Sequence, residues 1–489
     1  MKKEKLFLII ASLFTLCAGL YAKDDAYTYD FWEQPQKSPD VYSVTHVVYA
    51  DGLKLDEPLK NPTNLFCKDN FVYVTDTDNN RIVQLEYTAD KKLVPVRIID
   101  HFNSNGQVEE KFSAPKDIFV NADGSMFIAD TNNSRVVKLD KDLNYIMTLK
   151  EPDDPTYDSS KQFLPEKVIA DSKGRAYVIA RNLNRGFVKY EYDGKFQGFF
   201  GANKVIFDFT DYLWKKFSTK EQRDQMASFS PTEFTNAFMD KEGFIYAVTK
   251  TFDEWDLLSG DAKPIRRLNA LGDDILVENA FDPPVGDLTW GTAAGIQGSS
   301  KFSDITVLDD EIYIALDETH GRIFAYDNQG YLLFAFGNRG NIDGFFRLPC
   351  SIEHIGKDLF VLDNTNASIT VLSPTEFGNY IYLATEQYGR GEYDESAETW
   401  NKVLQQNANY DLAYIGLGKS YLRKNEYKKA MDCFKLKRDR RDYSKAFGYY
   451  RKEWVEEHFS TIAGIVIGII ALILIIKIIK YFKREFKSL

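Results

Sequence analysis

The chain has 489 residues, of which 44% are apolar and 15% aromatic, so it is long and apolar enough to bury more than one core. Its net charge of −11 is unevenly distributed: residues 1–22 carry +2 and residues 476–489 carry +4, which leaves −17 on the segment between them. So acidic a segment is a poor ligand for phosphate backbones or anionic surfaces, and no nucleic-acid partner is expected.

The N-terminal stretch, residues 1–22, has the pattern of a secretory signal peptide. Three lysines precede the apolar run Leu6–Leu20, and Ala22 stands just before a charged stretch. Residues 23–60 form a leader without a clear repeat. Within it, Ser43–Ala50 has the composition of a strand that could complete the last unit of a ring and so remove an exposed sheet edge.

One pattern recurs between residues 61 and 374: a short apolar strand, an Asp, a polar turn, and an Arg five residues after the Asp. The pairs are Asp76 with Arg81, Asp130 with Arg135 and Asp317 with Arg322, and a further copy has Asp363 with Ser368. Six copies, each with four short strands, predict a mainly β fold, a six-bladed β-propeller. The Asp is expected to cap the turn and the Arg to tie neighbouring blades together, which is a structural role.

These residues resemble the NHL-repeat family, whose propellers commonly have six blades. The resemblance is strong in blades one, two, five and six. It weakens in blade three, where Ala180 replaces the Asp, and in blade four (Phe244–Lys250), which has neither the Asp nor the Arg.

Three insertions fall near blades three and four: Val205–Phe229, Thr251–Pro264 and Ala280–Ser300. In a propeller, the links between blades share one face with the loops between second and third strands, so the insertions should gather on that face. The ligand-binding residues that they predict are Tyr212, Trp214, Asp253, Trp255 and Trp290. A glycan that stacks on the tryptophans is one candidate ligand. The alternative is that these loops only pack over one another.

The residues that begin the innermost strands should surround the central channel: Asn64, Asp117, Lys167, Glu233, Asp304 and Ser351. Four of them, Asn64, Asp117, Glu233 and Asp304, could hold Ca²⁺ or Mg²⁺ as a cofactor, so a metal-dependent lyase or lactonase is the alternative function. Lys167 would neutralise one carboxylate, and backbone amides commonly satisfy such carboxylates. No nucleophile elbow, P-loop or HExxH motif is present, so no catalytic residue is assigned.

The period changes after Pro374. Equivalent residues lie 34 positions apart, as in Tyr380/Tyr414, Ala384/Gly418, Ser396/Ala430 and Trp400/Phe434. This register resembles the tetratricopeptide repeat, with two repeats over residues 377–438 and a capping or stalk helix over 439–459. The resemblance implies a surface that binds a protein partner, and a membrane transporter is one candidate.

Residues 460–480 are predicted to form a transmembrane helix, because the run Ile462–Ile476 is uninterrupted and apolar. Basic residues follow the run and acidic residues precede it, which places residues 481–489 in the cytoplasm and the rest of the chain outside. The sequence therefore predicts a single-pass cell-membrane protein whose outer part binds or scaffolds other molecules.

Overall fold

The computed structural model describes residues 26–30, 34–104, 108–157, 160–181, 183, 185–201, 234–250, 252, 256–257, 260, 262–278, 283–288 and 298–485. The chain forms two compact units, which divide between Asn379 and Tyr380. The N-terminal unit is built of strands and the C-terminal unit of helices.

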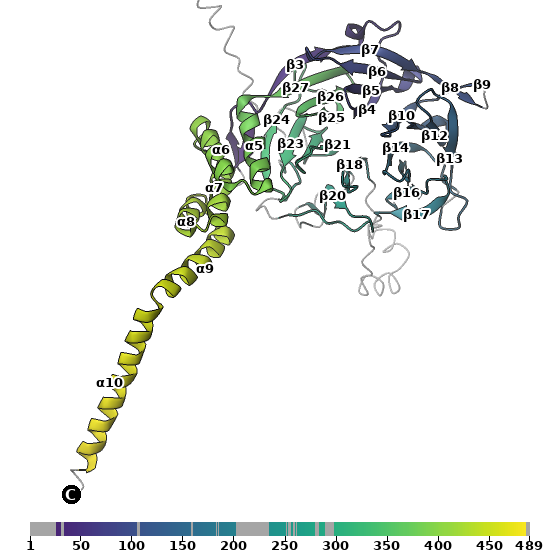
Figure 1. The fold of residues 1–489 in the computed structure, drawn as a ribbon. Helices are drawn as coiled ribbons and strands as arrows, with labels where there is room; N and C mark the ends of the chain where they lie inside the picture. Colours follow the sequence, from purple (N-terminus) through teal and green to yellow (C-terminus); the bar gives the residue numbers. More distant parts are fainter. Residues whose placement is uncertain are drawn as a thin grey trace, which may run out of the picture. The chain divides into compact units, whose positions relative to one another are not determined.

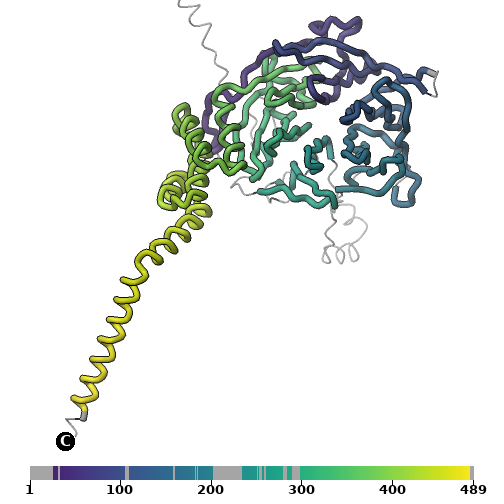
Figure 2. Tube along the Cα trace, viewed as in Figure 1, coloured from purple at the N-terminus to yellow at the C-terminus, as the bar shows by residue number. Residues whose placement is uncertain are grey.

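The N-terminal unit is a six-bladed β-propeller, as the sequence predicts (Figures 1 and 2). Blade one contains β4 (Pro62–Lys68), β5 (Phe71–Asp76), β6 (Arg81–Tyr87) and β7 (Leu93–Ile99). Blade two contains β10 (Pro115–Val120), β11 (Met126–Asp130), β12 (Arg135–Leu139) and β13 (Tyr145–Leu149), and blade three contains β14 (Pro165–Ala170), β15 (Ala176–Ala180), β16 (Phe187–Tyr190) and β17 (Phe196–Phe200). Every pairing within these blades is antiparallel, from the innermost strand outward.

The other three blades depart from this regular plan. In the described part of the chain, blade four has three strands, β18 (Asn236–Met239), β19 (Ile245–Val248) and β20 (Ile265–Leu268). Blade five contains β21 (Phe302–Val307), β22 (Tyr313–Asp317), β23 (Arg322–Tyr326) and β24 (Leu332–Phe336), and blade six begins with β25 (Pro349–Ile355), β26 (Asp358–Asp363) and β27 (Ser368–Pro374). A separate two-stranded sheet, β8 (His101–Ser104) with β9 (Val108–Lys111), follows blade one in the chain.

The N-terminal segment supplies the outer strands of blades five and six. β3 (Tyr42–Val48) pairs antiparallel with β27 and so closes the ring. β1 (Tyr27–Tyr29) pairs with β24 and with β2 (Pro35–Lys37), which widens blade five to six strands. We call Ala26–Ser38 the N-terminal strap.

The repeated Asp and Arg residues fix the turns of blades one and two. In blade one a 3-10 turn (Thr77–Asn79) and the left-handed Asn80 (φ 55°) separate β5 from β6. The Asp76 carboxylate accepts hydrogen bonds from the Lys60 amide (2.7 Å) and from Nε of Arg81 (2.7 Å). Blade two repeats this arrangement, because Nε of Arg135 donates to Asp130 (2.8 Å). Each pair therefore ties its turn to the link that precedes the blade.

Apolar faces of neighbouring blades pack against each other and form the core. Between blades two and three, for example, Phe127, Val136, Phe163, Val178 and Val188 are almost completely buried. This face-to-face packing makes the propeller a rigid frame around the channel.

The C-terminal unit consists of consecutive helices. They are α5 (Glu376–Arg390), which begins just before the division between the units, α6 (Tyr393–Gln406), α7 (Asp411–Arg423), α8 (Tyr427–Leu436), α9 (Arg440–Glu457) and α10 (Phe459–Glu485). Small residues let the helices approach closely: Gly416 lies against the Trp400 ring and Gly418 against the Phe434 ring. The Asp439 carboxylate caps α9 by accepting the Asp442 amide (2.9 Å).

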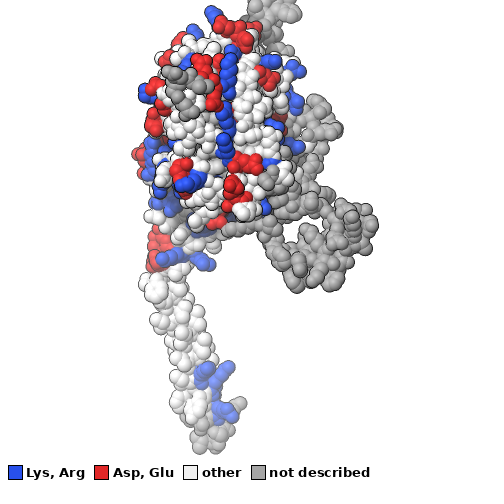
Figure 3. Space-filling model, turned by 90° about the vertical axis from the view of Figure 1, so that its right-hand side faces the viewer, with Lys and Arg blue, Asp and Glu red and all other residues white. Residues whose placement is uncertain are grey.

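The last helix is apolar and uncovered. Phe459–Arg484 contains an 18-residue window with a mean hydropathy of 3.1, none of which is buried, so the helix is long and apolar enough to span a membrane. Figure 3 shows its surface without charged side chains until basic residues appear at its far end.

Candidate functional site

The residues predicted to bind a ligand on the insertion face cannot be placed. Tyr212, Trp214, Asp253, Trp255 and Trp290 all lie outside the described residues. Their role remains a prediction, and the described part of the candidate site is the central channel.

The strand register shows which residues surround one end of the channel. Asp117 stands opposite Ala129, the residue before the repeated Asp, and the equivalent position in blade four pairs Asn236 with Val248. The register thus assigns the blade-four position to Asn236, three residues after Glu233, which itself lies outside the described residues. The channel ring consists of Asn64, Asp117, Lys167, Asn236, Asp304 and Ser351, and all six are buried.

Hydrogen bonds occupy both carboxylate oxygens of Asp117. Oδ1 accepts a hydrogen bond from Nδ2 of Asn64 and lies 3.4 Å from Nζ of Lys167, whereas Oδ2 accepts the Val168 amide (2.7 Å). Asp117 therefore connects blade two to the blades on both sides of it.

Asp304 and Ser351 continue the same pattern around the ring. Oδ2 of Asp304 accepts the Ser351 hydroxyl (2.6 Å) and the Ile352 amide (2.8 Å), and Oδ1 accepts the Ile305 amide (2.8 Å). Oγ of Ser351 in turn accepts the Leu65 amide of blade one (3.0 Å). The ring residues thus act as bonds between adjacent blades.

The described part of the ring does not support the predicted metal site, whose remaining ligand, Glu233, lies outside the described residues. Both of its carboxylates are fully engaged by protein donors, and Lys167 is buried beside one of them. Among the residues that the structure describes, no group of three or more His, Cys, Asp or Glu side chains could hold a metal ion. Holding the blades together is the role that these contacts support.

One further buried carboxylate near the ring, that of Glu353, was not among the residues predicted from the sequence. Side chains alternate along a strand, so Glu353 lies on the same side of β25 as Ser351, and it is only 5% exposed. No hydrogen bond joins its carboxylate to another described side chain. The alternation of β25 was the signal that could have identified it.

The channel charges are strongly coupled. Burial raises the pKa of Asp117 to about 6, although Lys167 opposes this shift, and burial also raises the pKa of Asp304 and of Glu353. Burial opposes the charge of Lys167, but the three carboxylates together raise its pKa. The lysine therefore remains a cation at the centre of an acidic cluster.

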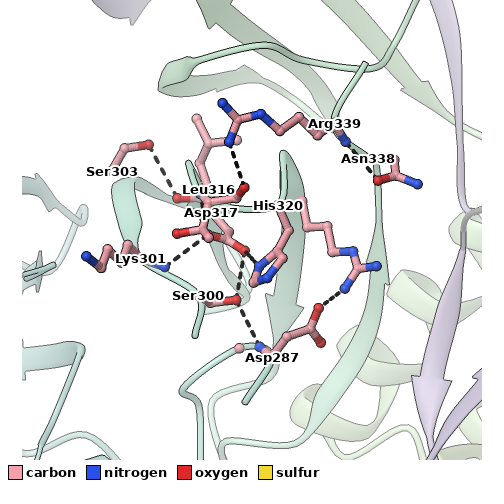
Figure 4. A network of polar contacts seen from close by, with 12 residues as sticks. Asp287, Ser300, Lys301, Ser303, Leu316, Asp317, His320, Asn338 and Arg339 are labelled. Carbon is pink, nitrogen blue, oxygen red and sulfur yellow. Dashed lines mark hydrogen bonds and ion pairs between the residues drawn. The ribbon is translucent and has the colours of Figure 1, made fainter. Parts of the chain in front are cut away.

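In blade five the predicted side-chain pairing of Asp317 with Arg322 does not form. Arg322 does not bond Asp317; its guanidinium pairs with Asp287, from the insertion before blade five. Figure 4 shows Ser300 between Asp287 and Asp317, with His320 directed at the Asp317 carboxylate. The Ser300 hydroxyl donates to Asp317 (2.8 Å), and Nδ1 of His320 lies 2.6 Å from the same oxygen.

Asp287 also fastens the N-terminal strap. It is 3% exposed, and its carboxylate accepts hydrogen bonds from the Tyr27 hydroxyl (2.8 Å) and from the Tyr29 hydroxyl. The Arg322 guanidinium lies over the Tyr27 ring, 5.1 Å from its centre. This buried network therefore holds the strap on blade five.

Comparison with known proteins finds distant structural similarity and no family. No protein-family model matches the sequence, and no curated protein matches it. A virginiamycin B lyase from Staphylococcus aureus is 11% identical, with 68% of this chain and 99% of that chain covered and a TM-score of 0.41. A protein of unknown function from Bacteroides thetaiotaomicron is 11% identical, with 70% and 80% covered and a TM-score of 0.42. A streptogramin B lyase is 13% identical, with 68% and 98% covered and a TM-score of 0.39.

Proposed function

We propose that this protein is a membrane-anchored binding or scaffold protein whose folded units lie outside the cell. In this proposal an NHL-type propeller presents a ligand face, and tetratricopeptide-like helices bind a protein partner, such as a membrane transporter. The observation that carries the proposal is the uncovered apolar helix α10.

The ends of α10 suit a membrane span. Phe459 at its start and Tyr481 and Phe482 near its end are 65%, 62% and 56% exposed. From Phe459 to Tyr481 the helix rises about 33 Å, at 1.5 Å for each of 22 steps, close to the roughly 30 Å hydrocarbon thickness of a bilayer. Aromatic side chains commonly mark both interfaces, and the basic residues after Ile476 favour a cytoplasmic C-terminus.

Packing in the helical unit supports the tetratricopeptide resemblance. Residues 34 positions apart are buried in pairs, namely Ser396 with Ala430 and Trp400 with Phe434. The equivalent residues Leu383 and Leu417 differ, since Leu383 is 37% exposed and Leu417 only 6%. An exposed leucine at a position that the repeat otherwise buries is a candidate contact for a protein partner.

Membrane insertion can be tested first. The substitutions Ile470→Arg and Leu472→Arg place two charges near the centre of the span, each expected to cost about 2.5–3.5 kcal/mol of insertion free energy. The intact protein should resist alkaline carbonate extraction, and the double variant should be extracted. A matched Ile470→Leu/Leu472→Ile variant should remain in the membrane. An intact protein that carbonate extracts completely would contradict the proposal.

Partner binding is tested by cross-linking the intact protein in its membrane. Leu383→Asp should remove a cross-linked protein partner, whereas Trp255→Ala with Trp290→Ala should remove a ligand of the insertion face. Asp117→Asn, inside the channel, serves as a control and should remove neither. If no interaction responds to either surface change, the proposed division of binding surfaces is wrong.

A further inference from the structure

A cavity opens at the other end of the channel, on the face where the first and second strands of each blade are joined. We call this the turn face. The cavity measures about 170 Å³, and blades four, five and six all contribute to its lining. An engineered protein cavity of roughly 150 Å³ holds one benzene molecule, so a ligand with about six heavy atoms would fit.

The inner wall of the cavity is apolar and uncharged. Phe238, Val307 and Leu308 supply apolar surface, and His354 lies beside Phe238 with a distance of 5.9 Å between ring centres. Nδ1 of His354 lies 2.6 Å from the Thr306 hydroxyl, and burial lowers the pKa of His354 to about 4. The imidazole is therefore neutral at physiological pH and does not repel a cation.

The rim of the cavity is acidic. Four carboxylates line it, from Asp240, Glu242, Asp309 and Glu311, together with the single ammonium of Lys241. The Arg267 guanidinium forms ion pairs with two of these carboxylates, at 2.5 Å from Glu311 and 3.7 Å from Asp240. Counting both basic side chains against the four acids leaves a net charge of −2 at the rim.

Two rim carboxylates remain accessible to a ligand. No hydrogen bond or ion pair joins the Glu242 carboxylate to another described residue. The Asp309 side chain is 88% exposed, and its only described partner is Lys241 at 3.4 Å. An anion would be repelled here and a neutral apolar molecule would leave the charges unused, whereas a cation with a short apolar chain matches both the rim and the wall.

We propose that this turn-face cavity binds a short alkylammonium group, with the alkyl chain against Phe238 and the ammonium between Glu242 and Asp309. The group could come from a free small amine or from a lysine side chain of a partner protein. The site lies at the end of the channel opposite the insertion face, so it is separate from the ligand face of the proposed function.

The test is ligand-observed saturation-transfer NMR with the full chain in nonionic detergent. Butylammonium and 1-butanol have the same number of heavy atoms and differ in charge. At constant ionic strength, butylammonium should give saturable transfer, in the millimolar range expected of so small a ligand, and 1-butanol should bind at least about fivefold more weakly. Equal binding of the two would overturn the proposal, because the rim charges would then contribute nothing.

Variants locate the site. Glu242→Gln with Asp309→Asn should weaken butylammonium binding about five- to tenfold, as expected for two exposed charges, and leave 1-butanol unchanged. The matched control Asp142→Asn/Asp193→Asn removes the same charge from turns of blades two and three and should have no effect. Phe238→Ala removes the apolar surface against which the alkyl chain packs and should weaken binding of both molecules. Equal weakening by the control pair, or unchanged binding in Phe238→Ala, would overturn the proposal.

The source of the ammonium is distinguished by a further arm. Nα-acetyl-lysine amide carries the same alkylammonium on a peptide backbone. Binding as tight as that of butylammonium would indicate a lysine side chain of a partner, and binding at least tenfold weaker would indicate a free amine. Circular dichroism and thermal midpoints like those of the unmodified protein establish that each variant is folded.

Discussion

Protonation of Asp117 should stabilise the propeller, and the amount can be estimated from the structure. Asp117 is completely buried, and its pKa of about 6 lies above the value of roughly 3.9 for an unfolded chain. The folded protein therefore binds this proton more tightly than the unfolded one. The stabilisation is complete below about pH 4 and is lost as the pH rises through 6.

The size of the effect follows from the difference between the two pKa values. At 1.36 kcal/mol per pH unit, the loss between pH 3 and pH 7 is about 3 kcal/mol. With about 2.1 cal/mol/K of unfolding entropy per residue and roughly 350 residues in the propeller, this corresponds to about 4 °C in the thermal midpoint. Lys167 stays charged over this range, so it does not reverse the trend.

The substitution Asp117→Asn isolates this contribution. The amide oxygen can still accept the Val168 N–H, but the amide nitrogen faces two donors, Asn64 and Lys167, so the variant should be less stable at every pH. This penalty does not titrate. The difference in midpoint between the unmodified protein and the variant should therefore shrink by about 4 °C from pH 3 to pH 7.

The assay is thermal unfolding of the full chain in nonionic detergent, followed by intrinsic fluorescence in steps of half a pH unit. Asp69→Asn is the matched control, because it removes the same charge from a side chain that is 76% exposed, and it should leave the thermal midpoint unchanged. A difference for Asp117→Asn that stays constant, or grows as the pH rises, would refute the reasoning about burial in the channel.

Three further substitutions test other contacts. Asp287→Ala leaves the Arg322 guanidinium and two tyrosine hydroxyls without their acceptor. Because Arg322 is 27% exposed, the free energy that holds the N-terminal strap should fall by about 2–3 kcal/mol, which is measurable as faster tryptic cleavage of the strap. Gly418→Ala would place a Cβ 2.7 Å from the fully buried Phe434 ring, so helical stability by circular dichroism should fall by about 1–3 kcal/mol. Arg135→Lys cannot reproduce hydrogen bonds to two carboxylates at once and should lower the thermal midpoint of the propeller by about 1–3 °C. A wild-type result in any of these would show that the contact is not stabilising.

The repeat made the propeller predictable, because each blade carries its three inner strands and its turn within about fifty residues. The same local reasoning fails at blade four. There the turn motif is lost and a long insertion precedes the blade, so the sequence offers Glu233 at the ring position, whereas the register has Asn236. With both the Asp and the Arg missing, nothing local fixes the start of the innermost strand.

Contacts between distant segments account for the rest of what the sequence could not show. Tyr27 lies 260 positions from Asp287, so no periodicity connects them. Arg322 follows Asp317 at the expected spacing, yet its guanidinium pairs with the carboxylate of Asp287, which comes from an insertion. His354 and Phe238 meet only because the ring places the inner strands of blades four and six on either side of blade five. Repeats predict the frame, and the irregular segments determine the sites.

The strap and the closing strand make the propeller depend on its N-terminal segment. β24 and β27 would both be open sheet edges without β1 and β3, and open edges pair readily with other chains. The pairing of Val48 with Ile369 closes a loop of more than three hundred residues. The entropic cost of closing a loop grows only slowly with its length, but here the chain loses that entropy before the ring contacts form. The ring therefore cannot close until β27 is available. A chain of this design is exposed to edge-to-edge aggregation during synthesis, and the Asp287 network lowers that risk by fastening the strap to blade five.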